Sequence, residues 1–75
     1  MNLDAISDHV WVAVIEGTKP VNFEFLGLQL LITNLRQRLR AKEITMPVAV
    51  CNLKQFLAKY RALPAAQNDF NKIAR

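Results

Sequence analysis

The chain has 75 residues and a formal net charge of +4, with 52% hydrophobic and 21% charged residues. This length fits one small domain spanning residues 1–75 and excludes most multi-domain enzymes. The composition is too apolar for a disordered protein, so we expect the chain to fold.

The sequence predicts a cytoplasmic protein. Its single cysteine, Cys51, excludes an internal disulfide and fits a reducing compartment. Asp4 and Asp8 lie where a secretory signal would need a basic start. The longest uncharged run, Phe25 to Leu35, is shorter than the ~20 residues of a membrane-spanning helix, so we expect no membrane association.

Charge is distributed unevenly along the chain. Through Leu31 it carries four acidic residues and one lysine, whereas from Ile32 onward it carries nine basic residues and two acidic ones. The acidic first part and the basic remainder could meet across an interface between copies, or the basic part could bind an outside polyanion.

The first segment, Leu3 to Glu16, has helical spacing of its apolar residues and is followed by Gly17, a typical helix C-cap. Val12 and Ile15 fall outside the main apolar stripe, so this helix is expected to carry an apolar pair on its second side. A β-hairpin is the alternative, because β-branched residues cluster in 10–15 and residues 21–25 alternate after the Gly-containing turn.

The second segment, from about Asn22 to Lys42, is predicted as a long central helix of roughly 30 Å. One broad apolar stripe contains Phe25, Leu28, Leu31, Ile32, Leu35 and Leu39. Phe23, Leu26 and Leu30 lie on the opposite side, so the first half of the helix is apolar nearly all round.

Two further helices are predicted. Thr45 and Pro47 supply a helix start, and the apolar stripe that follows ends at Leu63, before Pro64. A short helix over 65–75 has Asn68 or Asp69 as its cap, with Phe70 and Ile73 on one apolar side. The predicted fold class is all-α, a compact bundle of three to four helices around a long central helix. The alternative is an N-terminal β-hairpin followed by two to three helices.

The sequence offers no pattern typical of catalysis. His9 is the only histidine, Cys51 has no spacing that pairs it with a base, and the acidic residues are scattered. We therefore predict that the protein is not an enzyme and has no cofactor, metal or small-molecule substrate.

A basic cluster at the end of the central helix gives one functional hypothesis. Arg36, Arg38, Arg40 and Lys42 flank the Leu35 and Leu39 seam, which is typical of solvated cations near a helix C-terminus. The alternative is a DNA- or RNA-binding regulator, and an antiparallel second and third helix would bring part of this set together. The candidate nucleic-acid residues are Arg36, Arg40, Lys42, Lys54 and Arg61.

The excess of apolar residues gives the preferred hypothesis. A domain this short buries only about 60% of the surface that its unfolded chain exposes, so we expect part of its apolar surface to be covered by a partner. The predicted function is a small interaction module, such as an adaptor, chaperone or regulatory subunit, acting as a homodimer or on a larger protein. The predicted interface residues are Val12, Ile15, Phe23, Leu26 and Leu30.

Overall fold

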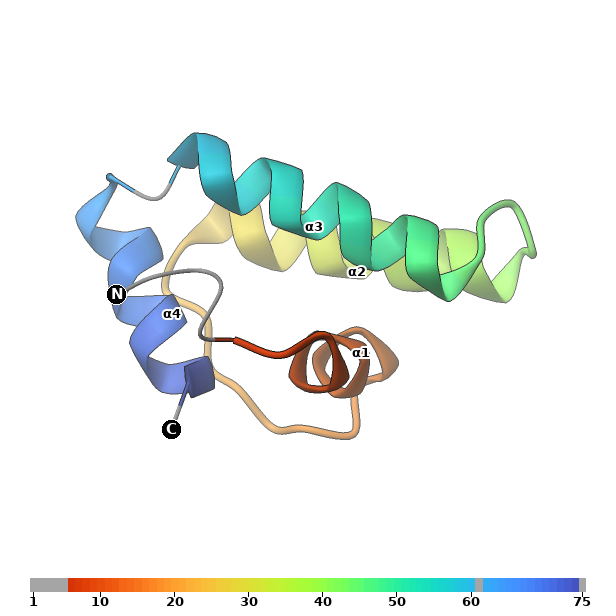
Figure 1. Cartoon of the computed structure of the whole chain (residues 1–75), viewed down its shortest axis with the longest axis horizontal. Helices are drawn as coiled ribbons and strands as arrows, with labels where there is room; N and C mark the ends of the chain where they lie inside the picture. The colour runs from red at the N-terminus through yellow and green to blue at the C-terminus, as the bar shows by residue number, and fades with distance from the viewer. Residues whose placement is uncertain (1–5, 61, 75) are drawn as a thin grey trace.

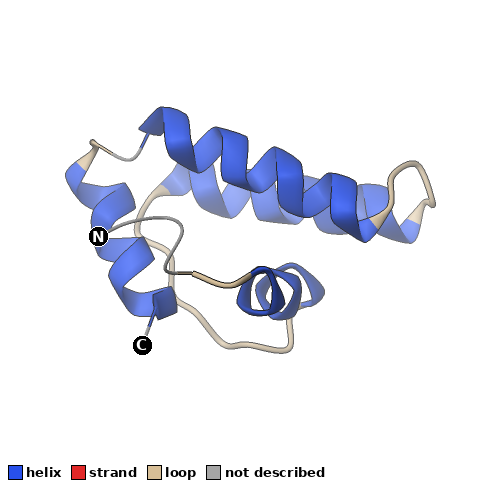
Figure 2. Cartoon of the chain, in the orientation of Figure 1, coloured by secondary structure: helices blue, strands red, loops and turns tan. Residues whose placement is uncertain are grey.

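The computed structural model describes residues 6–60 and 62–74 and contains four helices (Figure 1). They are α1 (Asp8–Glu16), α2 (Leu26–Arg40), α3 (Met46–Tyr60) and α4 (Pro64–Ala74). Figure 2 shows helices and loops, with no strand among the described residues. The prediction of an all-α fold is confirmed, and the alternative β-hairpin over residues 10–25 is wrong.

The two long helices, α2 and α3, lie side by side and antiparallel (Figure 1). In the same view α1 is seen almost end-on, so it crosses the α2–α3 pair, and α4 packs across the end at which α2 begins. The molecule measures 33 × 22 × 21 Å along its principal axes. The longest dimension follows the α2–α3 pair.

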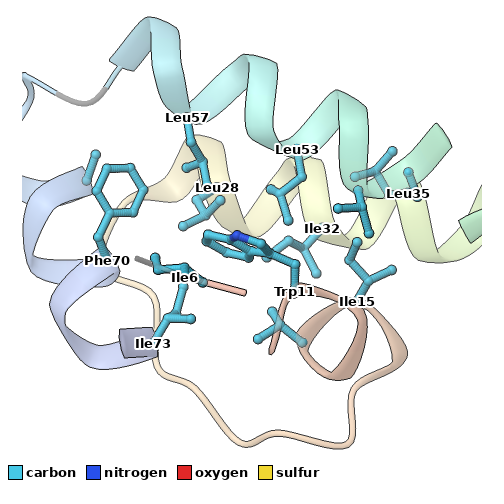
Figure 3. Close-up of a cluster of buried hydrophobic side chains, with 14 residues drawn as sticks. Ile6, Trp11, Ile15, Leu28, Ile32, Leu35, Leu53, Leu57, Phe70 and Ile73 are labelled. Carbon is cyan, nitrogen blue, oxygen red and sulfur yellow. The ribbon is translucent and has the colours of Figure 1, made fainter. Parts of the chain in front are cut away.

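One core lies between the four helices (Figure 3). The Trp11 side chain is 1% exposed and lies between α1, which carries it, and the α2–α3 pair. The buried hydrophobic residues are Ile6, Trp11, Val14, Ile15, Leu28, Ile32, Leu35, Ala49, Val50, Leu53, Leu57, Ala66, Phe70 and Ile73. Full burial of a side chain the size of leucine stabilises a fold by about 1.5–3 kcal/mol, so this shared cluster dominates the packing energy.

The first helix has a cap at each end. The Ser7 hydroxyl oxygen accepts a hydrogen bond from the Val10 N–H at 3.4 Å. Gly17 follows the helix with φ of 79°, a left-handed conformation that suits glycine. The predicted end of α1 is confirmed, whereas its start is at Asp8 and the predicted positions 3–5 lie outside the described residues.

The connection between α1 and α2 is extended and is held by α4. The two carboxylate oxygens of Asp69 accept the backbone N–H groups of Glu24 and Phe25 at 2.8 and 2.9 Å. Lys72 donates to the Asn22 carbonyl at 3.3 Å, and Lys19 donates to the Ile73 carbonyl at 2.8 Å. These bonds explain why α2 begins at Leu26 and not at the predicted Asn22.

Asp69 corrects a second prediction. The sequence offers Asn68 or Asp69 as the cap of the last helix, but both lie inside α4, and Asp69 is 0% exposed. Its carboxylate serves the approach to α2, which has no side-chain cap of its own at Phe25. Pro64 occupies the first position of α4, where its missing N–H has no cost.

Aromatic rings pack where α2 begins against α3. Phe25 and Phe56 are stacked with their centroids 6.0 Å apart, and Tyr60 lies 4.7 Å from Phe56. A Cβ at Gly27 would meet both phenylalanine rings at 3.2 Å, so the absence of a side chain there makes room for them. The third helix ends at Tyr60, earlier than the predicted Leu63, whose N–H bonds the Tyr60 carbonyl in a turn.

Candidate interaction surfaces

The most exposed large hydrophobic side chains belong to α2. Leu26 and Leu30 are 64% and 62% exposed and lie one turn apart, on the side of the helix opposite the buried Leu28 and Ile32. We call this side the α2 outer face and define it by its exposed residues Leu26, Leu30, Thr33, Asn34 and Gln37. It carries no charged residue.

The other three predicted interface residues do not join that face. Ile15 is 0% exposed and lies in the core, so its expected place on a second side of α1 is corrected. It is buried because α1 crosses both long helices, which cover a wide arc of its surface. Phe23 lies in the extended connection, half-buried against the core, and Val12 is half-buried on α1.

Val12 lines a groove between α1 and α3. The groove has a volume of about 580 Å³ and is lined by Asp8, Val12, Met46, Pro47, Val50, Cys51, Lys54 and Gln55. Lys54 forms an ion pair with Asp8, which links its two walls. Sequence reasoning missed this groove because its walls are far apart in the chain and their apolar residues resemble ordinary core positions.

The predicted nucleic-acid residues divide into two groups. Arg36 is engaged with α1, since its Nε donates to the Ile15 carbonyl at 2.7 Å and its Nη2 to the Val14 carbonyl at 3.1 Å. Lys54 is paired with Asp8. Arg40 and Lys42 are exposed at the α2–α3 turn, and Arg61 lies outside the described residues.

The α2–α3 turn also carries Arg38, whose Nε lies 3.7 Å from a carboxylate oxygen of Glu43. A polar hollow of about 410 Å³ adjoins it and is lined by Asn34, Gln37, Arg38, Ala41 and Glu43. Guanidinium and amide side chains are good donors to anionic oxygens. The structure thus places Arg38, Arg40 and Lys42 at one end of the molecule.

Residues with catalytic or ligating chemistry do not gather in the described part of the chain. His9 and Cys51 are both exposed, on α1 and α3. The described residues contain no group of three or more histidine, cysteine, aspartate or glutamate side chains placed to hold a metal ion. None of the described helices combines the length and apolar character needed to cross a bilayer.

Comparison with other proteins does not assign the chain to a family. No protein-family model, curated protein or solved structure matches this chain.

Proposed function

We propose that the protein is a small non-enzymatic interaction module that associates with a second copy of itself through the α2 outer face. The observation that supports this is the pair Leu26 and Leu30, both more than 60% exposed on the side of α2 opposite the core. Exposed leucines grouped on one helix face are a typical feature of an interface.

The charge distribution favours a second copy as the occupant. A twofold interface brings a surface patch against itself, so a charge close to the axis meets its own copy. The chain has a formal net charge of +4, yet the segment from Leu26 to Leu35 carries no charge at all. Thr33, Asn34 and Gln37 add donors and acceptors that can pair across such an axis.

The area of the α2 outer face limits the affinity of the self-association. A stable interface of standard size buries about 800 Å² on each partner, whereas two leucines and a few polar side chains on one helix cover less. We therefore expect a reversible dimer with a dissociation constant on the order of 10–100 μM.

Sedimentation equilibrium over a range of concentrations tests this proposal. The unmodified protein is expected to shift from monomer to dimer, and Leu30→Glu to remain monomeric with its helical circular dichroism retained. Val48→Glu is the matched control, because Val48 is 45% exposed on α3 and lies outside the α2 outer face. A monomer at every concentration of the unmodified protein would overturn the proposal.

A charge-pairing experiment tests whether the contact is symmetric. Leu30→Glu and Leu30→Lys are each expected to be monomeric, because each places like charges together across the axis. An equimolar mixture is expected to regain the dimer, since opposite charges then meet. If the unmodified protein dimerises but the mixture does not, the α2 outer face is not paired with itself.

A further inference from the structure

We propose that the α2–α3 turn binds nucleic acid through the phosphate backbone, with Arg38, Arg40 and Lys42 as the contacting cations. We call these three residues the basic turn. These cations lie toward the end of α2 away from Leu26 and Leu30, and the hollow beside them shares Asn34 and Gln37 with the α2 outer face. Binding at the basic turn does not require self-association.

The charged side chains of the basic turn contribute little to the stability of the fold. Among the described residues, neither Arg40 nor Lys42 has an ion pair or hydrogen bond from its side chain, and both are exposed. The Arg38 contact with Glu43 is 3.7 Å long between side chains 45% and 62% exposed, and exposed pairs of this kind contribute about 0–1 kcal/mol.

Cations elsewhere in the described chain have internal partners. Lys19 and Arg36 donate to main-chain carbonyls of other elements. Lys54 and Lys72 pair with the carboxylates of Asp8 and Glu24, and the Lys59 Nζ lies 5.7 Å from the Tyr60 ring centroid. Among the described residues, the positive charge that remains for an outside partner is therefore concentrated at the basic turn.

The backbone at Lys42 strengthens this inference. Lys42 has φ of 59°, the left-handed region in which glycine is less costly than lysine. The Glu43 N–H bonds the Arg38 carbonyl at 2.9 Å, a C-terminal helix motif that usually carries glycine at this position. The dipole of α2 favours Arg38 and Arg40 near its C-terminus, but it does not explain a lysine in this strained position.

The surroundings of the basic turn fit nucleic acid better than a membrane surface. Asn34 and Gln37 line the adjoining hollow, and amide side chains pair with base edges and with phosphate oxygens. A membrane surface would require apolar side chains beside the cations, but the exposed leucines of α2 lie toward its other end.

Fluorescence anisotropy with a labelled mixed-sequence DNA duplex and a labelled RNA strand tests the proposal. With two or three phosphate contacts, we expect a dissociation constant on the order of 10⁻⁴ to 10⁻⁶ M that weakens as salt rises. Lys42→Gly and Arg40→Gln are each expected to weaken binding by about three- to tenfold, and each lowers the salt slope by about one.

The choice of variants separates binding from folding. Lys42→Gly removes the charge while relieving the backbone, so weaker binding by this variant cannot result from unfolding. Lys59→Gln is the matched control, because it removes the same charge from the exposed far end of α3 and should change binding less than about twofold.

The proposal is overturned by no binding to either nucleic acid at low salt, by binding that does not respond to salt, or by an equal loss from Lys59→Gln. Equally tight binding of a polyglutamate chain would show that the partner is any acidic polymer, and this too would overturn nucleic acid as the ligand.

Discussion

Asp69 shows how one buried side chain fixes a distant segment. Its carboxylate is 0% exposed and accepts two consecutive main-chain N–H groups, those of Glu24 and Phe25. Both donors belong to the connection that leads into α2, more than forty positions earlier in the chain. Hydrogen bonds to a charged acceptor contribute about 1.5–3 kcal/mol each, so the two bonds to Asp69 make a substantial contribution to the fold.

Asp69→Asn is expected to lower the free energy of unfolding by about 2–4 kcal/mol. The amide replaces one acceptor with a donor that faces an N–H group and leaves that group unpaired. Urea denaturation followed by circular dichroism measures the change. Asn68→Ala, next to it and exposed, is the control and should differ from the unmodified protein by less than about 0.5 kcal/mol.

Two of the described residues adopt left-handed backbone conformations, and they differ in how well they suit them. Gly17 has φ of 79° and Lys42 has φ of 59°. A Cβ at Gly17 would also lie 3.3 Å from the Arg36 guanidinium, whereas Lys42 is exposed. Glycine is therefore required at the first position and would be preferred by stability alone at the second.

Opposite effects on stability are expected at these two positions. Lys42→Gly should raise the free energy of unfolding by about 0.5–1 kcal/mol, and Gly17→Ala should lower it by about 1–2 kcal/mol. Thermal and urea denaturation of both variants check this. A loss of stability in Lys42→Gly would mean that the lysine side chain contributes to the fold, and it would weaken the argument for the basic turn.

At the scale of elements, α1 depends on a side chain from α2. Arg36 donates to the carbonyls of Val14 and Ile15 in the last turn of α1. No basic residue lies in the last turn of α1 itself, so Arg36 supplies the cation that a helix C-terminus favours. This contact ties the end of α1 to the middle of the long helix.

Arg36→Lys is expected to destabilise this junction although it keeps the charge. A lysine cannot reproduce the two directed donors of the guanidinium, so we expect a loss of about 1–2 kcal/mol. Hydrogen exchange should be faster at the amides of Gly17 and Thr18, which bond the carbonyls of Val14 and Ala13. Arg40→Lys is the control, and equal exchange in both variants would contradict the role of Arg36.

Sequence patterns predicted helix existence better than helix limits. Apolar spacing and proline or glycine signals located all four helices, because those signals are local. The predicted start of α2 at Asn22 was wrong because Asp69 and Lys72 hold the preceding residues extended. Such bonds join residues of different elements, and no local pattern contains them.

The candidate surfaces, too, were predictable where one helix determines them and not where several elements meet. The exposure of Leu26 and Leu30 was predictable from the helical wheel of one helix, and that prediction is confirmed. The burial of Ile15 depends on how α1 crosses two other helices, and the engagement of Arg36 depends on where α1 ends. The periodicity of one segment predicts neither the burial of Ile15 nor the hydrogen bonds of Arg36.

At the scale of the whole molecule, all four helices contribute to one core. Trp11, Leu28, Leu53 and Phe70 come from α1, α2, α3 and α4, and all are buried in the same cluster. No helix has a second core of its own among the described residues. We therefore expect the chain to unfold as one cooperative unit.

Coincident unfolding transitions test this expectation. Trp11 is the only tryptophan and is 1% exposed, so its fluorescence reports the packing of α1, while circular dichroism at 222 nm reports all the helices. The two urea midpoints are expected to agree within the error of the fits. An earlier fluorescence midpoint would show that α1 detaches before the other helices unfold.

The hold of α4 on the α1–α2 connection has a consequence for biosynthesis. On a ribosome, α1, α2 and α3 are complete before Asp69 and Lys72 of α4 are made. The connection between the first two helices therefore lacks its hydrogen bonds to α4 at that stage. The nascent chain then exposes apolar surface that the finished protein covers, and its final arrangement is reached only when the last helix has emerged.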